Sequence, residues 1–402
     1  MPERRCAVTR VEDGTVRIAG PSIGPAFTQT VLEVAGAVLT WPVLAPTGLP
    51  AAEIHDVGRA QQWLWAVYGE RAAAAVDAVA SGTPAAELTL PERPTALAEG
   101  AARLALGHWA ARWWPTSYLD GIPALEPDLL GLELAALTHE CQQLLEGSEE
   151  LEGRELLEEH QAALAPLIRW RQSADPPRQL DRVLRLTDDA ADNAGLDGEA
   201  LRRLRSALDQ AHRPTATPLD LAELFLQHRE FSLAAGALHT ASGRVIARGS
   251  GSNDWCRYPP GFVDAAENAV SWTAYALGAD RRIEVEVVAG IAAPVGGAHL
   301  AAEVHVDGGP PNRVPLARRD DVWTGRVDLD IPASTTPSMA VGILLPGFDP
   351  GPGADDRAAR EAVRALARHR LGVATAPHDS EAAHPEPFLA EIVAAAAMEE
   401  DF

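Results

Sequence analysis

The sequence predicts an α+β protein, with a mostly α-helical first domain over residues 1–230 and an antiparallel β-sandwich over residues 231–348. Apolar residues recur at every third or fourth position through most of the first part, a period typical of amphipathic helices. After about residue 231 they recur at every second position, which is typical of strands with one buried face. At 402 residues the chain is longer than one hydrophobic core usually supports, so two main domains are expected, followed by a linker and C-terminal helical extension over residues 349–402.

The first domain is expected to begin with a small β-hairpin. Two short alternating runs, residues 6–10 and 15–19, flank the dipeptide Asp13-Gly14. Asp-Gly between alternating runs is typical of a tight hairpin turn. From about residue 27 to residue 230 the pattern predicts helices.

Seven segments of this first domain have helical periodicity. They are residues 56–79, 94–114, 128–146, 154–171, 178–193, 198–213 and 217–229. Pro115 ends the second segment, because proline cannot donate to the helical hydrogen-bond ladder. The clearest helix is 128–146, which carries one continuous apolar stripe and is followed by Gly147 as its expected end. The stripe consists of Leu130, Leu134, Leu137, Cys141 and Leu144.

The second domain is predicted to contain short strands at regular spacing. A hairpin is expected over residues 237–248, and further strands over residues 270–277, 282–289, 300–306, 312–317, 323–329 and 338–344. Such spacing is typical of a sandwich. The run from Asp320 to Val327, Asp-Asp-Val-Trp-Thr-Gly-Arg-Val, resembles the E–F region of many immunoglobulin-like domains. The resemblance implies an immunoglobulin-like β-sandwich and carries no function with it.

The extension after residue 348 begins with a Pro/Gly-rich linker, residues 348–354. A short helix is expected over residues 355–369. The apolar stretch 388–397 is expected to be a docking helix or a loosely held tail.

The chain is strongly acidic, with a net charge of −23 from 57 acidic and 34 basic residues, all of the latter arginine. A field this negative repels phosphate backbones and anionic lipids, so neither nucleic acid nor a membrane is an expected partner. A cationic protein or peptide would be attracted instead, but solubility alone is the favoured interpretation of the charge.

The three cysteines, Cys6, Cys141 and Cys256, are far apart in the sequence and odd in number. This pattern argues against a disulfide framework and against a structural zinc site, and no cofactor or metal is expected. The N-terminal arginines are not followed by an apolar stretch, and no run of about 18 apolar residues occurs. The sequence therefore predicts neither a secretory signal nor a membrane span, and the cytoplasm is the expected compartment.

His139-Glu140-Cys141 is the first motif that could suggest a metal site. A zinc-protease helix needs a second histidine four residues after the first, and this chain has Gln143 there. Cys141 lies on the leucine stripe, so it is expected to be a buried thiol. The acidic stretch 146–159 is interpreted as a solvated face or as a contact surface for a basic partner.

A tryptophan cluster gives the first candidate binding site: Trp109, Arg112, Trp113 and Trp114. Three tryptophans within six residues can fill a core. Together with an arginine they can also anchor an interface, where Trp and Arg often carry much of the binding energy.

A glycine- and serine-rich segment, residues 248–261, gives the second candidate site. Its proposed binding residues are Arg248, Asp254, Trp255, Arg257 and Tyr258. Such side chains on a loop of a β scaffold are typical of recognition. The segment lacks the spacing of a phosphate-binding P-loop and of a serine nucleophile elbow. The alternative is a connecting Ω-loop held together by its own aromatic residues.

The favoured hypothesis is a non-enzymatic binding or adaptor protein, which recognises a protein, peptide or small molecule through this loop and an acidic surface. The alternative is a tailoring enzyme of a biosynthetic pathway that uses residues 254–258. That enzyme would need a Cys256 thiolate and a histidine base, with His239, His299 or His305 as the candidates. A structural subunit of a larger assembly is a third hypothesis.

Overall fold

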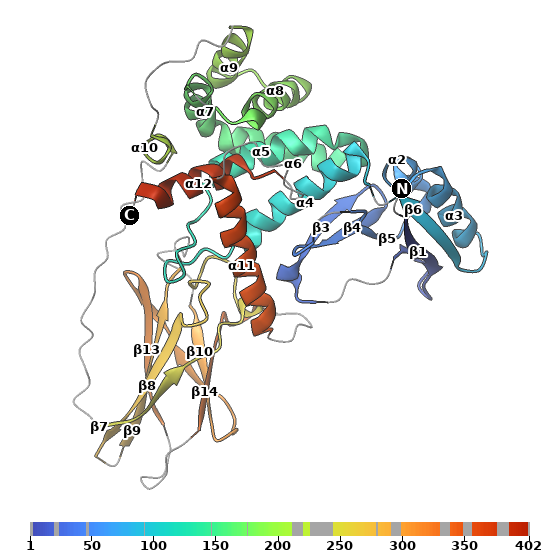
Figure 1. Ribbon diagram of the computed structural model, residues 1–402. Coiled ribbons are helices and arrows are strands. Elements are labelled where there is room, and N and C mark those ends of the chain that lie inside the picture. The colour runs from blue at the N-terminus through green and yellow to red at the C-terminus, as the bar shows by residue number, and fades with distance from the viewer. Residues whose placement is uncertain are drawn as a thin grey trace. The chain divides into compact units, whose positions relative to one another are not determined.

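Two units make up the chain, each assembled from segments that are not contiguous in sequence (Figure 1). Unit 1 contains Met1–Trp114, Leu125–His228 and Arg368–Phe402, and unit 2 contains Pro115–Ala124 and Arg229–Ala367. The structure, a computed structural model, describes residues 3–19, 24–45, 48–91, 93–145, 147–174, 176–210, 220–225, 244–278, 280–290, 299–329, 338–348, 356–375 and 386–400. The predicted domain boundary at residue 230 lies outside these ranges and that at 348 lies at the edge of one, so both stay predictions.

Unit 1 begins with a six-stranded antiparallel sheet in the order β3-β4-β5-β2-β1-β6. Its strands are β1 (Glu3–Arg10), β2 (Val16–Ile18), β3 (Gln29–Val34), β4 (Ala37–Pro42), β5 (Ala51–Ile54) and β6 (Ala86–Pro91). The predicted hairpin around Asp13-Gly14 is confirmed, with Thr9 opposite Arg17. The prediction of helix throughout residues 27–230 is wrong, because residues 29–54 and 86–91 contain four of the six strands.

The missed hairpin of β3 and β4 has a clear physical basis. Burial alternates along β3, so its side chains point in turn to the core and to solvent. The turn between the strands uses Gly36 at a φ of +74°, where an added Cβ would lie 2.3 Å from the Asp56 carbonyl oxygen. Period two was present in this sequence, but each of the two strands covers only six residues.

Helices form most of the rest of unit 1. The predicted helix 56–79 is divided into α1 (Val57–Ala60), α2 (Leu64–Tyr68) and α3 (Glu70–Ala80), with Gly69 at a φ of +88° between the last two. The following helices are α4 (Ala96–Trp113), α5 (Pro127–Glu140), α6 (Gly147–His160), α7 (Leu164–Arg171), α8 (Arg178–Asn193), α9 (Glu199–Asp209) and α10 (Leu221–Phe225). Single turns of 3-10 helix occur at Ala26–Thr28, Gln142–Leu144 and Gln161–Ala163.

The centre of unit 1 is α5, whose residues 129–138 are all buried. The predicted leucine stripe is buried along its whole length, including Cys141, whose pKa burial raises to about 12. The helix ends at Glu140, and Gly147 begins α6 where it had been expected to end a longer helix. A helix buried on every face is typical of the core of a helical unit.

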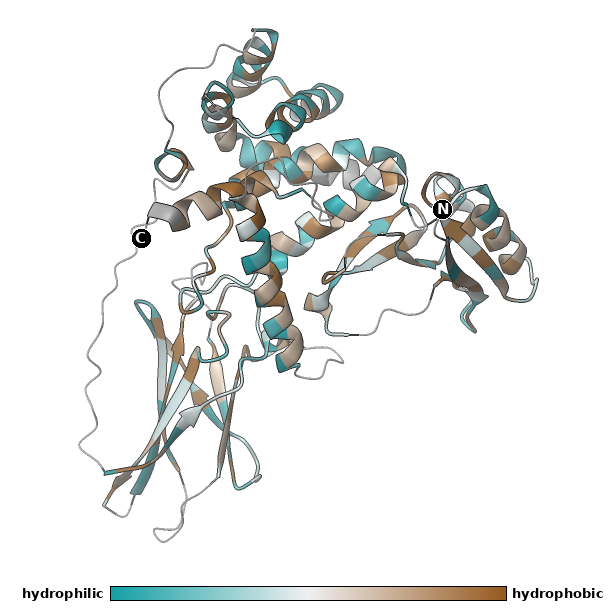
Figure 2. Cartoon of the chain, in the orientation of Figure 1, coloured by the Kyte–Doolittle hydropathy of each residue, from teal (hydrophilic) through white to brown (hydrophobic). Residues whose placement is uncertain are grey.

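Two helices follow the strands of unit 2. The first part of α11 (Arg357–Ala374) belongs to unit 2 and its last part to unit 1. In unit 1, α12 (Leu389–Glu400) packs against α5 and α10, and Figure 2 shows apolar residues concentrated along it. Of the helices that the structure describes, none is both long and apolar enough to cross a bilayer.

Unit 2 contains two antiparallel sheets, with strand orders β12-β13-β9-β8-β7 and β11-β10-β14. The strands are β7 (Arg244–Ser250), β8 (Val270–Leu277), β9 (Asp280–Val288), β10 (Ala301–Val306), β11 (Asn312–Pro315), β12 (Ala317–Arg319), β13 (Val322–Leu329) and β14 (Met339–Leu344). One buried cluster joins both sheets, for example Val285 of β9 and Val304 of β10.

The predicted fold class is therefore wrong as a whole. A helical domain followed by an immunoglobulin-like sandwich and a short extension does not describe this chain, because helices and strands are interspersed along it. The reason is that each unit contains residues from distant parts of the sequence. The periodicity of successive segments does not indicate which distant segments pack together.

Candidate functional site

The predicted loop 248–261 lies in unit 2, where most of its proposed binding side chains make internal contacts. The Asp254 carboxylate accepts a hydrogen bond of 3.0 Å from the Cys256 amide and caps the short helix Trp255–Arg257. Trp255 and Tyr258 are buried, and Arg257 donates to Glu303 Oε2 at 2.8 Å. Arg248, on β7, is exposed to solvent. These contacts favour the alternative in which the loop is held by its own side chains.

The hypothetical cysteine-dependent activity gains no geometric support from this loop. His239 lies outside the described residues, and the Nδ1 atom of His305 lies 2.9 Å from the Gly309 carbonyl oxygen in its own β-turn region. Within the described ranges, no group of three or more His, Cys, Asp or Glu side chains is placed to hold a metal ion.

Asn253, which is completely buried, connects this loop to residues 264–266. Its Nδ2 donates to the carbonyl oxygens of Asp264, at 2.9 Å, and Ala266, at 2.7 Å. Its Oδ1 accepts from the Tyr258 hydroxyl. Burial raises the pKa of Tyr258 well above its usual value, so this phenol stays protonated and remains a donor. The loop therefore serves as a rigid support for the chain beside it.

The carboxylate of Asp264 is the centre of that support, with only 2% of the residue exposed. It accepts hydrogen bonds from the Ser117 hydroxyl and the Tyr118 amide, both at 2.7 Å, and from the Ala266 amide at 2.9 Å. A buried carboxylate is costly unless its oxygens are satisfied by donors of this kind. Asp264 thus fixes a turn that lies almost 150 residues earlier in the sequence.

This turn, residues 117–122, is also closed by its own backbone. Ser117 and Ile122 exchange two hydrogen bonds, of 2.9 and 2.7 Å, and Gly121 adopts a φ of +64°. The Ser117 hydroxyl accepts from the Asp120 amide at 2.9 Å, while Arg364 Nε of α11 lies 3.2 Å from Asp120 Oδ2. The backbone of the turn is therefore held at both its beginning and its end.

Arg364 belongs to a buried ion-pair network at the start of α11. Glu267 accepts from Arg360 at 2.7 and 3.0 Å and from Arg364 at 3.0 Å, and both arginines are nearly inaccessible to solvent. Burial alone would raise the pKa of Glu267, but the hydrogen bonds and charges of the two guanidinium groups outweigh it and lower the pKa. The network attaches α11 to residues 264–267, the same segment that holds the turn through Asp264.

Two apolar side chains project from this fixed turn into solvent. Tyr118 is 58% exposed and Leu119 is 42% exposed, and both are among the largest exposed apolar residues of the described chain. Sequence reasoning missed them. The local signal was a turn-forming Ser-Tyr-Leu-Asp-Gly run between Pro115 and Pro123, but the restraint from Asp264 is invisible in the sequence.

The tryptophan cluster lies in unit 1, so the two predicted site groups belong to different units. Trp109 is buried and its Nε1 donates to the Phe27 carbonyl oxygen at 2.8 Å, which places it in the core. Trp113 and Trp114 are half-buried, and the exposed Arg112 guanidinium lies 5.2 Å from the Trp113 ring centre. One part of the cluster is core and another part is a cation–π pair at the surface.

No protein-family model, curated protein or solved structure matches this chain.

Proposed function

We propose that this chain is a non-enzymatic binding or adaptor protein, and that the Tyr118–Leu119 turn engages a protein partner. The observation that carries the proposal is a buried aspartate whose hydrogen bonds fix a turn that exposes two apolar side chains. An internal connection needs neither the buried carboxyl group nor the exposed apolar residues. Both are expected where a loop is shaped for recognition.

Rigidity of the turn favours affinity. A partner that binds a mobile loop must order it, and that entropy cost is absent when the loop already has its bound shape. Tyrosine is also among the residues that most often dominate binding energy, because it buries a large ring with few rotatable bonds. Tyr118 is therefore the proposed anchor, with Leu119 beside it.

The partner is expected to offer an apolar pocket in a basic surrounding. The net charge of −23 attracts a basic surface over distance and repels acidic ones. This attraction mainly raises the association rate, whereas burial of the Tyr118 ring by the partner lowers the dissociation rate.

Site-specific photo-crosslinking tests this proposal. A photoreactive phenylalanine analogue is placed at position 118 and, as a control, at position 245, because Val245 is similarly exposed in the same unit. We expect a protein captured at 118 and not at 245, and about tenfold weaker binding of that purified protein to Tyr118→Ala.

Asp264→Asn gives the matched variant, because it keeps both exposed side chains and removes one acceptor from the turn. It is expected to weaken binding while the circular dichroism spectrum stays unchanged. Equal capture at positions 118 and 245, or full affinity in Tyr118→Ala, would rule out the turn as the binding element.

A further inference from the structure

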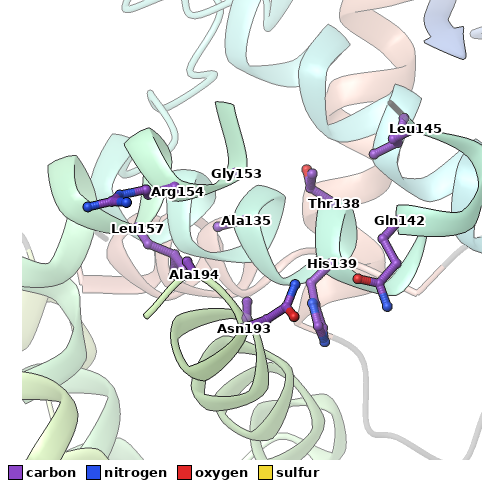
Figure 3. A pocket seen from close by; sticks show the side chains of 11 residues that line it. Ala135, Thr138, His139, Gln142, Leu145, Gly153, Arg154, Leu157, Asn193 and Ala194 are labelled. Atoms are coloured by element: carbon purple, nitrogen blue, oxygen red, sulfur yellow. The ribbon is translucent and has the colours of Figure 1, made fainter. Parts of the chain in front are cut away.

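A pocket of about 210 Å³ lies among α5, α6 and α8 in unit 1 (Figure 3). It exists because small residues meet where these helices cross: Ala135, Gly153, Ala190 and Ala194. The approach of α6 to α5 is close, since a Cβ added at Gly153 would lie 3.2 Å from Thr138 Cγ2. Larger side chains at these positions would fill the space.

One side of the pocket is polar. Its side chains are Thr138, His139, Gln142 and Asn193, and Figure 3 shows His139, Gln142 and Asn193 on the same side of the cavity. Across the residues that the structure describes, none of these four side chains forms a hydrogen bond with another residue. Four polar side chains with open donors and acceptors around one hollow are typical of a ligand site.

The lining carries little net charge. It contains no carboxylate, and its one arginine, Arg154, lies 3.0 Å from Glu158 on the next turn of α6. The opposite side is formed by apolar groups such as Leu157 and the alanines. An ion would therefore lose its hydration without gaining a counter-charge, whereas an amide or hydroxyl group would find partners.

We infer that this pocket binds a small uncharged molecule with an apolar end and an amide or hydroxyl end. Its volume is below the roughly 300–1,000 Å³ of pockets for drug-sized ligands, so only a small group fits. The pocket lies entirely in unit 1, and its role is independent of the proposed Tyr118–Leu119 turn.

Ligand-observed NMR on the full chain tests this inference with three probes of similar size: benzamide, benzoate and benzylammonium. We expect benzamide to bind with a millimolar or sub-millimolar Kd, and the two ions at least fivefold more weakly. Tighter binding of either ion would refute the uncharged class, and no binding of any probe would refute the site.

Two variants locate the binding. Ala190→Leu fills the pocket and is expected to abolish benzamide binding, whereas Asp189→Leu, at an exposed position on the same helix, leaves it unchanged. If Ala190→Leu fails to fold, Gln142→Leu combined with Asn193→Leu provides a second test, because it removes two polar groups near the surface. An unchanged benzamide Kd in a folded pocket variant would overturn the inference, without any consequence for Tyr118.

Discussion

Each unit secures a C-terminal helix through a glutamate, yet the two carboxylates have opposite surroundings. In unit 1, Glu133 of α5 is 1% exposed and accepts the Leu389 amide at the start of α12 at 2.6 Å. Its nearest guanidinium group, that of Arg103, is 3.5 Å away. In unit 2, Glu267 is paired directly with two buried arginines of α11.

The pKa values of Glu133 and Glu267 differ in the direction that these surroundings predict. Burial raises the pKa of Glu133 to about 7, because Arg103 and the α12 amides compensate only part of the lost hydration and the nearby Glu391 adds to the rise. At Glu267, burial again acts to raise the pKa, but the guanidinium groups of Arg360 and Arg364 outweigh it and lower the pKa. Amide dipoles thus hold a helix end without stabilising a full negative charge as well as arginines do. Unit 1 should weaken toward high pH, and unit 2 toward low pH.

The largest loss of folding stability is expected from Arg364→Met in unit 2. This change leaves Glu267 with one buried arginine fewer and removes the Arg364 contact of Asp120 at the turn. Removing one partner of a buried ion pair costs about 3–5 kcal/mol. Hydrogen exchange of the backbone amides of residues 116–122 should become much faster.

Arg357→Met is the matched control for that change. Arg357 lies 3.7 Å from the same Glu267, but its side chain is 81% exposed. Removing an exposed partner should change the free energy of unfolding by less than about 1 kcal/mol. Similar effects of the two substitutions would contradict the idea that burial gives the Glu267 network its strength.

The second-largest effect is a loss of stability with rising pH where Glu133 holds α12. In the unfolded chain the Glu133 carboxyl ionises near 4.5, whereas in the folded chain it keeps its proton to about pH 7. The native state therefore binds more protons between these values, and its stability falls as pH rises through this window. The shift corresponds to about 3 kcal/mol at pH 8.

Glu133→Gln isolates this contribution, because glutamine has the same shape and no charge. Amide exchange of residues 386–400, corrected for intrinsic rates, should show α12 opening more easily at pH 8 than at pH 5 in the natural chain. In the variant this difference should largely disappear. An identical pH dependence in both proteins would show that Glu133 does not control the docking of α12.

Some helices and strands of the fold could be predicted from the sequence, because their signals are local. The stripe from Leu130 to Leu144 is buried as its spacing indicated, and strands occur between residues 270 and 344 where the two-residue period was observed. Glu133 also lies on α5, but neither its burial nor its contact with Leu389, 256 residues later, has a local signature.

The candidate sites depend on distant contacts even more strongly. Trp255 and Tyr258 were identified as unusual, and they are buried supports within unit 2. The exposed pair that they help to position, Tyr118 and Leu119, comes from a segment inserted between two helices of unit 1. The pocket at Asn193 likewise forms only where three separate helices meet. No spacing rule connects such residues before the chain is folded.

The smallest effect is the loss of stability that unit 2 is expected to show at acidic pH. The pKa of Glu267 and that of Glu303 are both lowered, the latter mainly by a hydrogen bond from Arg257. A lowered pKa contributes stability above the unfolded value and loses it as pH falls through the folded value, so unit 2 should lose stability below about pH 4.5. The loss is small, because both carboxylates keep some access to water and burial opposes both shifts.

Urea midpoints at pH 6 and pH 4 measure this loss of stability. Arg257→Met should reduce the difference between the two midpoints by the part that belongs to Glu303. Greater stability of unit 2 at pH 4 than at pH 6 would mean that its arginines do not hold these carboxylates ionised, and the contrast with Glu133 would fail.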